Sequence, residues 1–198
     1  MKRKTLTIIS AIVLLSAVLT AVVGTHSAGK PDTGTISRHA TSVAASGYAG
    51  VVKYLELVVL VDNYPYNKSL VTAWGLSIYC VADGVRFLFD TGPDGSTLRL
   101  NSEALGINLS SLDFIVLSHE HGDHVGGLKY LAKRLKNVRV YVPSSSKDLI
   151  SYVSELGLEP VPVHDTAALS RGVYIIGEVY GPPYEVAVAI NTSKGFVV

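Results

Sequence analysis

The sequence has little of what marks several classes of protein. It contains one cysteine in 198 residues, so no disulfide can form within the chain. Only 17% of the residues are charged, the net charge is +1, and the one dense basic run is Lys2-Arg3-Lys4. This excludes the broad positive surface on which nucleic-acid-binding proteins depend, so we expect no nucleic acid partner. Cys80 lies in an apolar run and is expected to be a buried, inert thiol.

The N-terminus has the layout of a targeting or anchoring segment. Lys2-Arg3-Lys4 precedes an uncharged, largely apolar stretch over 5–24, and polar residues follow it. We therefore expect an N-terminal hydrophobic helix that serves as a signal peptide or membrane anchor over 1–29, because its length is close to the roughly 20 residues that span a bilayer. Cleavage near Ala28 and retention as a transmembrane helix both stay open. Either one places the protein outside the cytoplasm, secreted or membrane-anchored.

The rest of the chain divides by composition. Residues 30–50 are rich in glycine, serine, threonine and alanine, which predicts a flexible tether. The whole chain is 48% apolar. Residues 51–198 are therefore enough for one domain with a sizeable core, but not for two. Short β-rich runs and helical patterns mix along this part, which predicts a layered α/β sandwich with a mixed sheet.

The expected strands share short apolar runs bounded by turn residues: 55–61, 76–81, 85–89, 114–117, 138–142, 161–163, 173–176 and 185–190. Asp83-Gly84 indicates a tight hairpin turn between the second and third of them. Helices are expected at 97–105, at 126–135 where leucines recur at helical spacing, and at 145–156 with serine caps at its start.

A cluster of histidines follows the run at 114–117. The segment 118–124 has the sequence Ser-His-Glu-His-Gly-Asp-His and contains half of the six histidines of the chain. A turn at Gly122 can aim three imidazoles and the Asp123 carboxylate into one pocket at the carboxyl end of the strand, where α/β folds place their sites. This favours metal binding over a polar surface loop. Imidazole and carboxylate ligands suit zinc, with manganese or iron as alternatives.

The order His-x-His-x-Asp-His after a buried strand resembles the signature of the metallo-β-lactamase superfamily, and Asp90-Thr91-Gly92 is similar to the Asp-Thr-Gly turn that precedes it there. Further segments resemble the dihydropteroate-synthase-like, methanopterin-related branch of metal-dependent hydrolases: 59–64, 74–77, 88–92, 105–107, 172–178 and 189–198. The resemblance covers most of the chain from residue 59. It implies a metallo-β-lactamase-type αββα sandwich with mixed sheets.

The resemblance also implies site roles. His119 and His121 would bind one metal ion, and Asp123 and His124 would bind a second, so the cofactor would be two zinc ions. Asp123 would also be catalytic, orienting the metal-activated water that attacks an ester, amide or phosphoester of a small-molecule substrate. Asp90 would orient ligands through hydrogen bonds, although a turn carboxylate at Gly92 explains it nearly as well.

Three nearby polar residues have simpler explanations. Glu120 lies between two expected ligands and is expected to face solvent. Asp62 and Asn63 either line the pocket or form a turn after the first strand.

The resemblance further implies an incomplete domain over 51–198. Relatives of this type supply more ligating histidines in a Gly-Cys-x-His segment, and the chain ends at Val198 where that segment would begin. Each ion would then be one protein ligand short. Strand 186–190 would lie at an unpaired edge, and a separately encoded C-terminal half is a possible partner. His164 is expected to be a surface histidine.

Functions from different classes stay open. The leading one is a metal-dependent hydrolase that is active if the second half is supplied. The alternative is a non-catalytic, truncated metal-binding or interaction remnant of that fold. A di-iron redox protein is a third, which iron in the purified protein would favour.

Overall fold

Side chains along the central strands belong alternately to two hydrophobic cores. The computed structural model describes residues 50–64, 66–181 and 183–198. In strand β4 (Phe114–Val116), Phe114 and Val116 face the core between two sheets, and Ile115 faces the core beneath the helices. Successive strand residues point to opposite faces, so β4 is buried on both sides. We call these two regions the inter-sheet core and the helix-side core.

The larger sheet is mixed, as predicted. Its order is β1 (Leu55–Val61), β2 (Ser77–Ala82), β3 (Val85–Phe89), β4, β5 (Arg139–Pro143) and β6 (Glu159–Val163). The first three strands pair antiparallel and the pairs from β3 to β6 are parallel. At the β2–β3 turn, Asp83 and Gly84 both have positive φ, which confirms the predicted hairpin.

The smaller sheet is antiparallel and contains two strands that the sequence did not predict. Its order is β10 (Gly195–Val197), β9 (Glu185–Thr192), β8 (Val173–Val179) and β7 (Ala167–Ser170). The expectation of an unpaired edge at 186–190 is wrong, because β9 lies between β8 and β10. The chain turns back after Thr192, and Val197 then pairs with Ile190.

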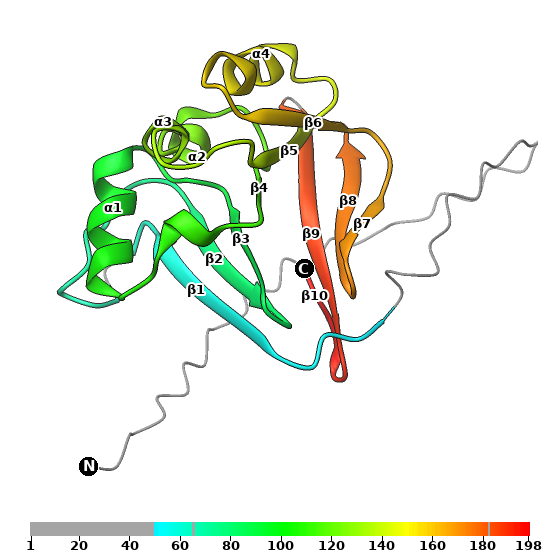
Figure 1. Ribbon diagram of the computed structural model, residues 1–198, viewed down its shortest axis with the longest axis horizontal. Coiled ribbons are helices and arrows are strands. Elements are labelled where there is room, and N and C mark those ends of the chain that lie inside the picture. The colour runs from blue at the N-terminus through cyan, green and yellow to red at the C-terminus, as the bar shows by residue number, and fades with distance from the viewer. Residues whose placement is uncertain (1–49, 65, 182) are drawn as a thin grey trace, which may run out of the picture. The chain divides into compact units, whose positions relative to one another are not determined.

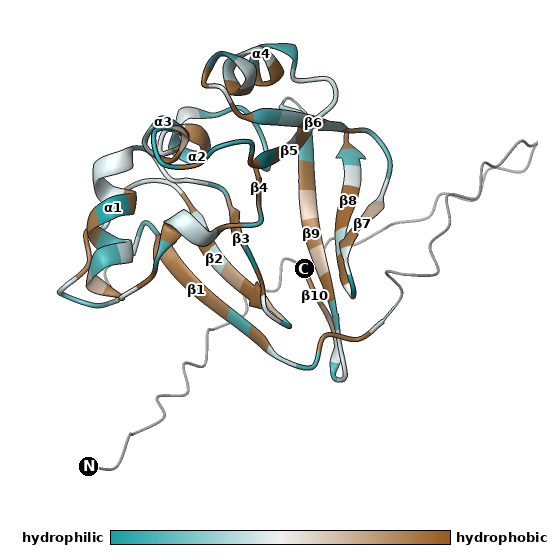
Figure 2. Cartoon of the chain, viewed as in Figure 1, coloured by the Kyte–Doolittle hydropathy of each residue, from teal (hydrophilic) through white to brown (hydrophobic). Residues whose placement is uncertain are grey.

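The helices cover one face of the larger sheet, and the smaller sheet covers the other (Figure 1). They are α1 (Gly95–Ala104), α2 (Gly122–Val125), α3 (Leu128–Ala132) and α4 (Lys147–Glu155), with a 3-10 turn at Leu109–Ser111. Hydrophobic stretches run along much of β1, β4 and β9, whereas β6 and parts of the helices and turns are hydrophilic (Figure 2). This arrangement of a helix layer and two sheets confirms the layered α/β prediction.

Two helix predictions need correction. The helix expected at 126–135 is shorter than predicted, because α3 covers only Leu128–Ala132. The Gly127 N–H donates to Gly92 O instead of joining a helical hydrogen-bond ladder, so α3 starts after it and is separate from α2. Helix α4 begins at Lys147, and the side chain of Ser146 makes no capping hydrogen bond. In α1, by contrast, the Asp94 carboxylate caps the helix by accepting from the N–H groups of Ser96 and Thr97.

The inter-sheet core is built around aromatic rings. Phe87 stacks on Phe114 with ring centroids 4.7 Å apart, and Tyr141 meets Phe114 edge-on. Cys80 is buried in the same core, as expected, and burial raises the pKa of its thiol to about 12. The large sheet therefore has a rigid support behind the strands that end at the candidate site.

The predictions for the N-terminus fall outside the described residues. The signal peptide or anchor at 1–29 lies wholly in that part of the chain, as does the tether except for its last residue. Both stay predictions, as does the domain boundary at residue 51. None of the helices in the described part is long and apolar enough to cross a membrane.

Candidate metal centre

The histidine-rich segment leaves the sheet at the end of β4. It runs through Ser118 and His119, which are buried, to His121, which is exposed, before the chain enters α2. Asp123 and His124 lie in that short helix and are half-buried. The segment therefore passes from the protein interior to the surface between Ser118 and His121.

The structure brings the predicted ligands together. The ring centroid of His119 lies 4.6 Å from that of His121 and 4.1 Å from that of His124. Asp123 Oδ2 lies 3.6 Å from His124 Nε2. Over the described ranges, however, no three His, Cys, Asp or Glu side chains are arranged as a set that could hold a metal ion. The four residues form one cluster, and their roles as ligands stay predictions.

Asp90 joins this cluster from the end of β3. Its side chain is fully buried and its φ is +58°, an uncommon conformation for a residue other than glycine. Oδ2 lies 2.7 Å from His124 Nδ1 and 2.7 Å from Ser118 Oγ, and Oδ1 accepts from Ser118 N at 2.7 Å. The carboxylate is thus bound to the histidine segment. Gly92, where a turn cap was the alternative, has its N–H on Leu76 O.

Close backbone packing holds the Asp90 turn against α2. Thr91 donates to His124 O through both its N–H, at 2.7 Å, and its Oγ1, at 3.0 Å. A Cβ at Gly126 would lie 1.9 Å from Pro93 O, and one at Gly127 would lie 2.2 Å from Thr91 O. These glycines let two backbone segments touch, which sets the position of His124.

The surroundings shift the pKa values of two histidines in opposite directions. Burial lowers the pKa of His119, and the neighbouring His124 adds to that effect. The hydrogen bond that His124 Nδ1 makes to the Asp90 carboxylate raises the pKa of His124 against the opposing effect of burial. A metal ligand must be a neutral imidazole, so His119 is the more readily available of the two.

Sequence reasoning missed two residues at this site. Ser118 contacts both Asp90 and His119, and its position directly before the first histidine was the available signal. Glu185, at the start of β9, acts on the charged forms of His119 and His124 through its negative charge. It had no local signal, because only the packing of the second sheet brings it near.

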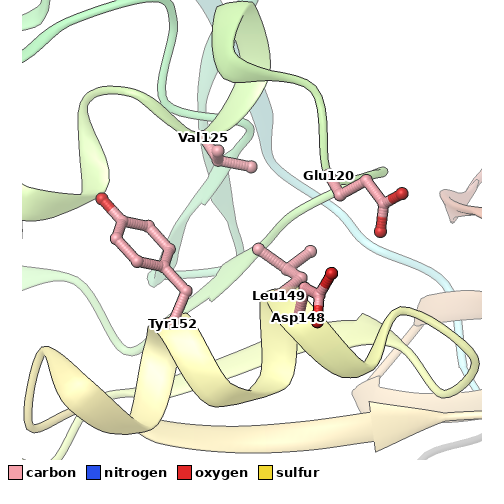
Figure 3. Close-up of a pocket in the computed structure, with 5 residues that line it drawn as sticks. All are labelled: Glu120, Val125, Asp148, Leu149 and Tyr152. Carbon is pink, nitrogen blue, oxygen red and sulfur yellow. The ribbon is translucent and has the colours of Figure 1, made fainter.

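A cavity of about 390 Å³ lies beside the histidine segment. Figure 3 shows Glu120 and Asp148 on one side of it, the Tyr152 ring on the other, and Val125 and Leu149 between them. Glu120 precedes His121 and Val125 follows His124, so the cavity borders the candidate metal centre. It offers carboxylates at one side and an apolar floor.

The sequence also led to predictions for Glu120, for His164 and for residues 62–63. Glu120 is exposed, as expected. The side chain of His164 is 79% exposed, and its Nδ1 lies 3.7 Å from Glu178, which confirms a surface histidine. Asn63 Oδ1 accepts from Gly75 N, and the Asp62 carboxylate accepts from Asn63 N. Neither hydrogen bond decides between a turn and a place in the pocket wall, so both alternatives stay predictions.

Comparison with known proteins identifies the family. Residues 72–183, more than half of the chain, match the family model of the metallo-beta-lactamase superfamily. The chain is similar to a 7,8-dihydropterin-6-methyl-4-(beta-D-ribofuranosyl)-aminobenzene-5'-phosphate synthase of Methanocaldococcus jannaschii, with 29% identity over 66% of this chain and 52% of the synthase. The chain therefore spans about half the length of this curated relative.

Solved structures share the fold at low identity. The metallo-beta-lactamase fold protein YhfI from Bacillus subtilis matches 73% of this chain and 60% of its own, with 16% identity and a TM-score of 0.52. An N-acyl homoserine lactone hydrolase, solved with its product at the catalytic metal center, matches 74% of each chain, with 16% identity and a TM-score of 0.52. The fold prediction is confirmed, and the chain belongs to the metallo-beta-lactamase superfamily.

Proposed function

We propose that this chain is a metal-dependent hydrolase domain in which His119, His121, Asp123 and His124 bind two metal ions, with zinc preferred over manganese or iron. The observation that carries the proposal is the histidine cluster at the end of β4, with His124 Nδ1 bound to buried Asp90 at 2.7 Å. Imidazoles and a carboxylate are donors that suit zinc. Because Asp90 occupies Nδ1 of His124, the Nε2 atom is left for a ligand bond.

The bound ions would polarise the scissile carbonyl or phosphoryl group and make water a nucleophile near neutral pH. The protein's own residues would do the rest. The half-buried Asp123 carboxylate would accept a hydrogen bond from the attacking water and orient it. Asp90 and Thr91 would hold His124 in place, and the cavity floored by Val125 and Leu149 would take the non-reacting part of a small-molecule substrate.

The comparisons support this proposal at different levels. The dihydropterin-related synthase supports the branch that the sequence predicted. The lactone hydrolase supports the fold of a hydrolase. The small-molecule substrate and the export of the domain are parts of the proposal that rest on the sequence.

Metal analysis of the full chain tests the proposal. After loading with zinc and desalting, we expect about two equivalents per chain, and loss of zinc in His119→Ala, His121→Ala and Asp123→Ala. His164→Ala is the matched control, because it removes an exposed histidine outside the cluster, and it should keep its zinc. Cleavage of ester, lactone and phosphodiester probes should then stop on addition of a chelator.

Two outcomes would contradict the proposal. An unaltered protein that takes up no zinc, manganese or iron would favour the non-catalytic alternative. Equal zinc content in His164→Ala and His119→Ala would remove the cluster as the binding site.

A further inference from the structure

We propose that Ser118 is a positioning residue. Its hydroxyl links the Asp90 carboxylate to the ring of His119 by hydrogen bonds, and this link fixes the tautomer of that ring. The inference rests on the proposed function only in taking His119 as a metal ligand. Asp90 is hydrogen-bonded to His124 directly, whereas its hydrogen-bonded path to His119 runs through Ser118. One buried carboxylate would then set two of the three rings in the cluster.

The backbone and side chain of Ser118 are held from both sheets. Its N–H donates to Asp90 Oδ1 at 2.7 Å, and its carbonyl accepts from Val186 N, in β9, at 3.0 Å. Its hydroxyl lies 2.7 Å from Asp90 Oδ2 and 2.9 Å from His119 Nδ1. The residue is only 7% exposed. The hydroxyl therefore stands at a defined place between the carboxylate and the ring.

The direction of the two hydrogen bonds follows from counting protons. A carboxylate only accepts, and a hydroxyl has one proton to donate. The Ser118 proton must point to Asp90, since otherwise two oxygens would face each other at 2.7 Å with no proton between them. The lone pairs of Ser118 Oγ are then left for His119, so Nδ1 of that ring carries its proton.

The consequence for metal binding is a fixed donor atom. With the proton on Nδ1, a neutral His119 has its lone pair on Nε2, as His124 does when its Nδ1 donates to Asp90. Free histidine prefers the opposite tautomer, with the proton on Nε2. Ser118 would therefore remove the cost of shifting the proton before a metal binds at Nε2 of His119.

The test measures ring tautomers directly. In the metal-free full chain, above the pKa of free imidazole of about 6.5, nitrogen NMR should show His119 protonated on Nδ1. Ser118→Ala should move the proton toward Nε2, and zinc affinity, measured by competition with a chelator, should fall about tenfold. Ser118→Thr keeps the hydroxyl and should keep both properties.

Ser77→Ala is the matched control. Ser77 is also buried and also bonds to Asp90, but through the Asp90 carbonyl rather than the carboxylate. Among the described residues its hydroxyl has no hydrogen bond to a histidine, so its loss should leave the tautomer and the zinc affinity unchanged.

Three results decide the matter. A proton on Nε2 of His119 in the unaltered protein would overturn the inference, even if no variant folds. Equal behaviour of Ser118→Ala and Ser77→Ala would also overturn it. The expected tautomer in a protein that binds no zinc would support the role of Ser118 while contradicting the proposed function, so the two failures are distinguishable.

Discussion

The two sheets lie face to face, but they contribute to the candidate site in different ways. The six-stranded sheet carries Asp90, Ser118 and the histidines at the ends of β3 and β4, joined by hydrogen bonds of 2.7 Å. The four-stranded sheet adds one backbone bond, from Val186 N to Ser118 O, and the charge of Glu185. The candidate ligands and Asp90 thus come from the six-stranded sheet, and the four-stranded sheet supports them by packing against it.

A second polar link between the sheets lies outside the histidine cluster. Glu178 of β8 accepts from Ser144 Oγ at 2.7 Å and from Ser145 N at 3.0 Å, and both serines lie between β5 and α4. We therefore expect that some substitutions between the sheets lower stability without changing metal binding, which the following predictions test.

The largest expected effect comes from the inter-sheet core. Phe87→Ala removes a fully buried ring that stacks on Phe114, and it should lower the free energy of unfolding by about 4 kcal/mol. Urea denaturation followed by circular dichroism measures the change. Phe196→Ala, at an aromatic residue that is 64% exposed, should change it by less than about 0.5 kcal/mol. Similar losses in both variants would mean that the inter-sheet core is not the main support.

The contact between the Asp90 turn and α2 should be nearly as sensitive. Gly126→Ala places a methyl group 1.9 Å from Pro93 O, so the backbone must move. We expect a loss of about 3 kcal/mol together with weaker zinc binding. Gly122→Ala is the control, because its Cβ would have no atom within 4 Å. If Gly126→Ala behaves like Gly122→Ala, close packing does not position His124.

Breaking the polar link should have a smaller effect and should spare the site. Glu178→Ala removes the acceptor of two hydrogen bonds from a side chain that is 4% exposed, and it should cost about 2 kcal/mol. Zinc content should not change, because Glu178 contacts none of the candidate ligands. Glu159→Ala, at an exposed position, should be close to neutral. Loss of zinc from Glu178→Ala would show that support and chemistry are coupled.

The smallest effect is expected at the cap of α1, and it should depend on pH. Hydrogen bonds from the backbone and side chain of Thr97 lower the pKa of Asp94. Its contribution is therefore present above the unfolded pKa of about 3.9 and is lost as the pH falls through the lower folded value. Asp94→Ala should cost about 1 kcal/mol at neutral pH and less in acid, as thermal unfolding would measure. Asp94→Asn keeps a cap without a titrating group, so a matching pH dependence in that variant would contradict this account.

Much of the secondary structure was predictable from local pattern. The strands at 55–61 and 85–89 have the predicted bounds, because apolar runs between turn residues are a strong local signal. Strands β7 and β10 were missed because they have only four and three residues, which is too short for a strand pattern to stand out. The helix predicted at 126–135 is shorter in the structure, where α3 covers Leu128–Ala132, and a tertiary bond from Gly127 N to Gly92 O lies just before its start.

The sequence by itself determined the chemical content of the candidate site, because its donor residues lie within one short segment after an apolar strand. Only the tertiary structure decided what holds them. Asp90 and His124 are 34 residues apart, and they meet because β3 and β4 pair in parallel, which brings their carboxyl ends to the same edge. The position of Glu185 near the histidines and the hydrogen bond from Val186 to Ser118 depend on the packing of the second sheet. No local sequence pattern predicts such contacts between residues far apart in the chain.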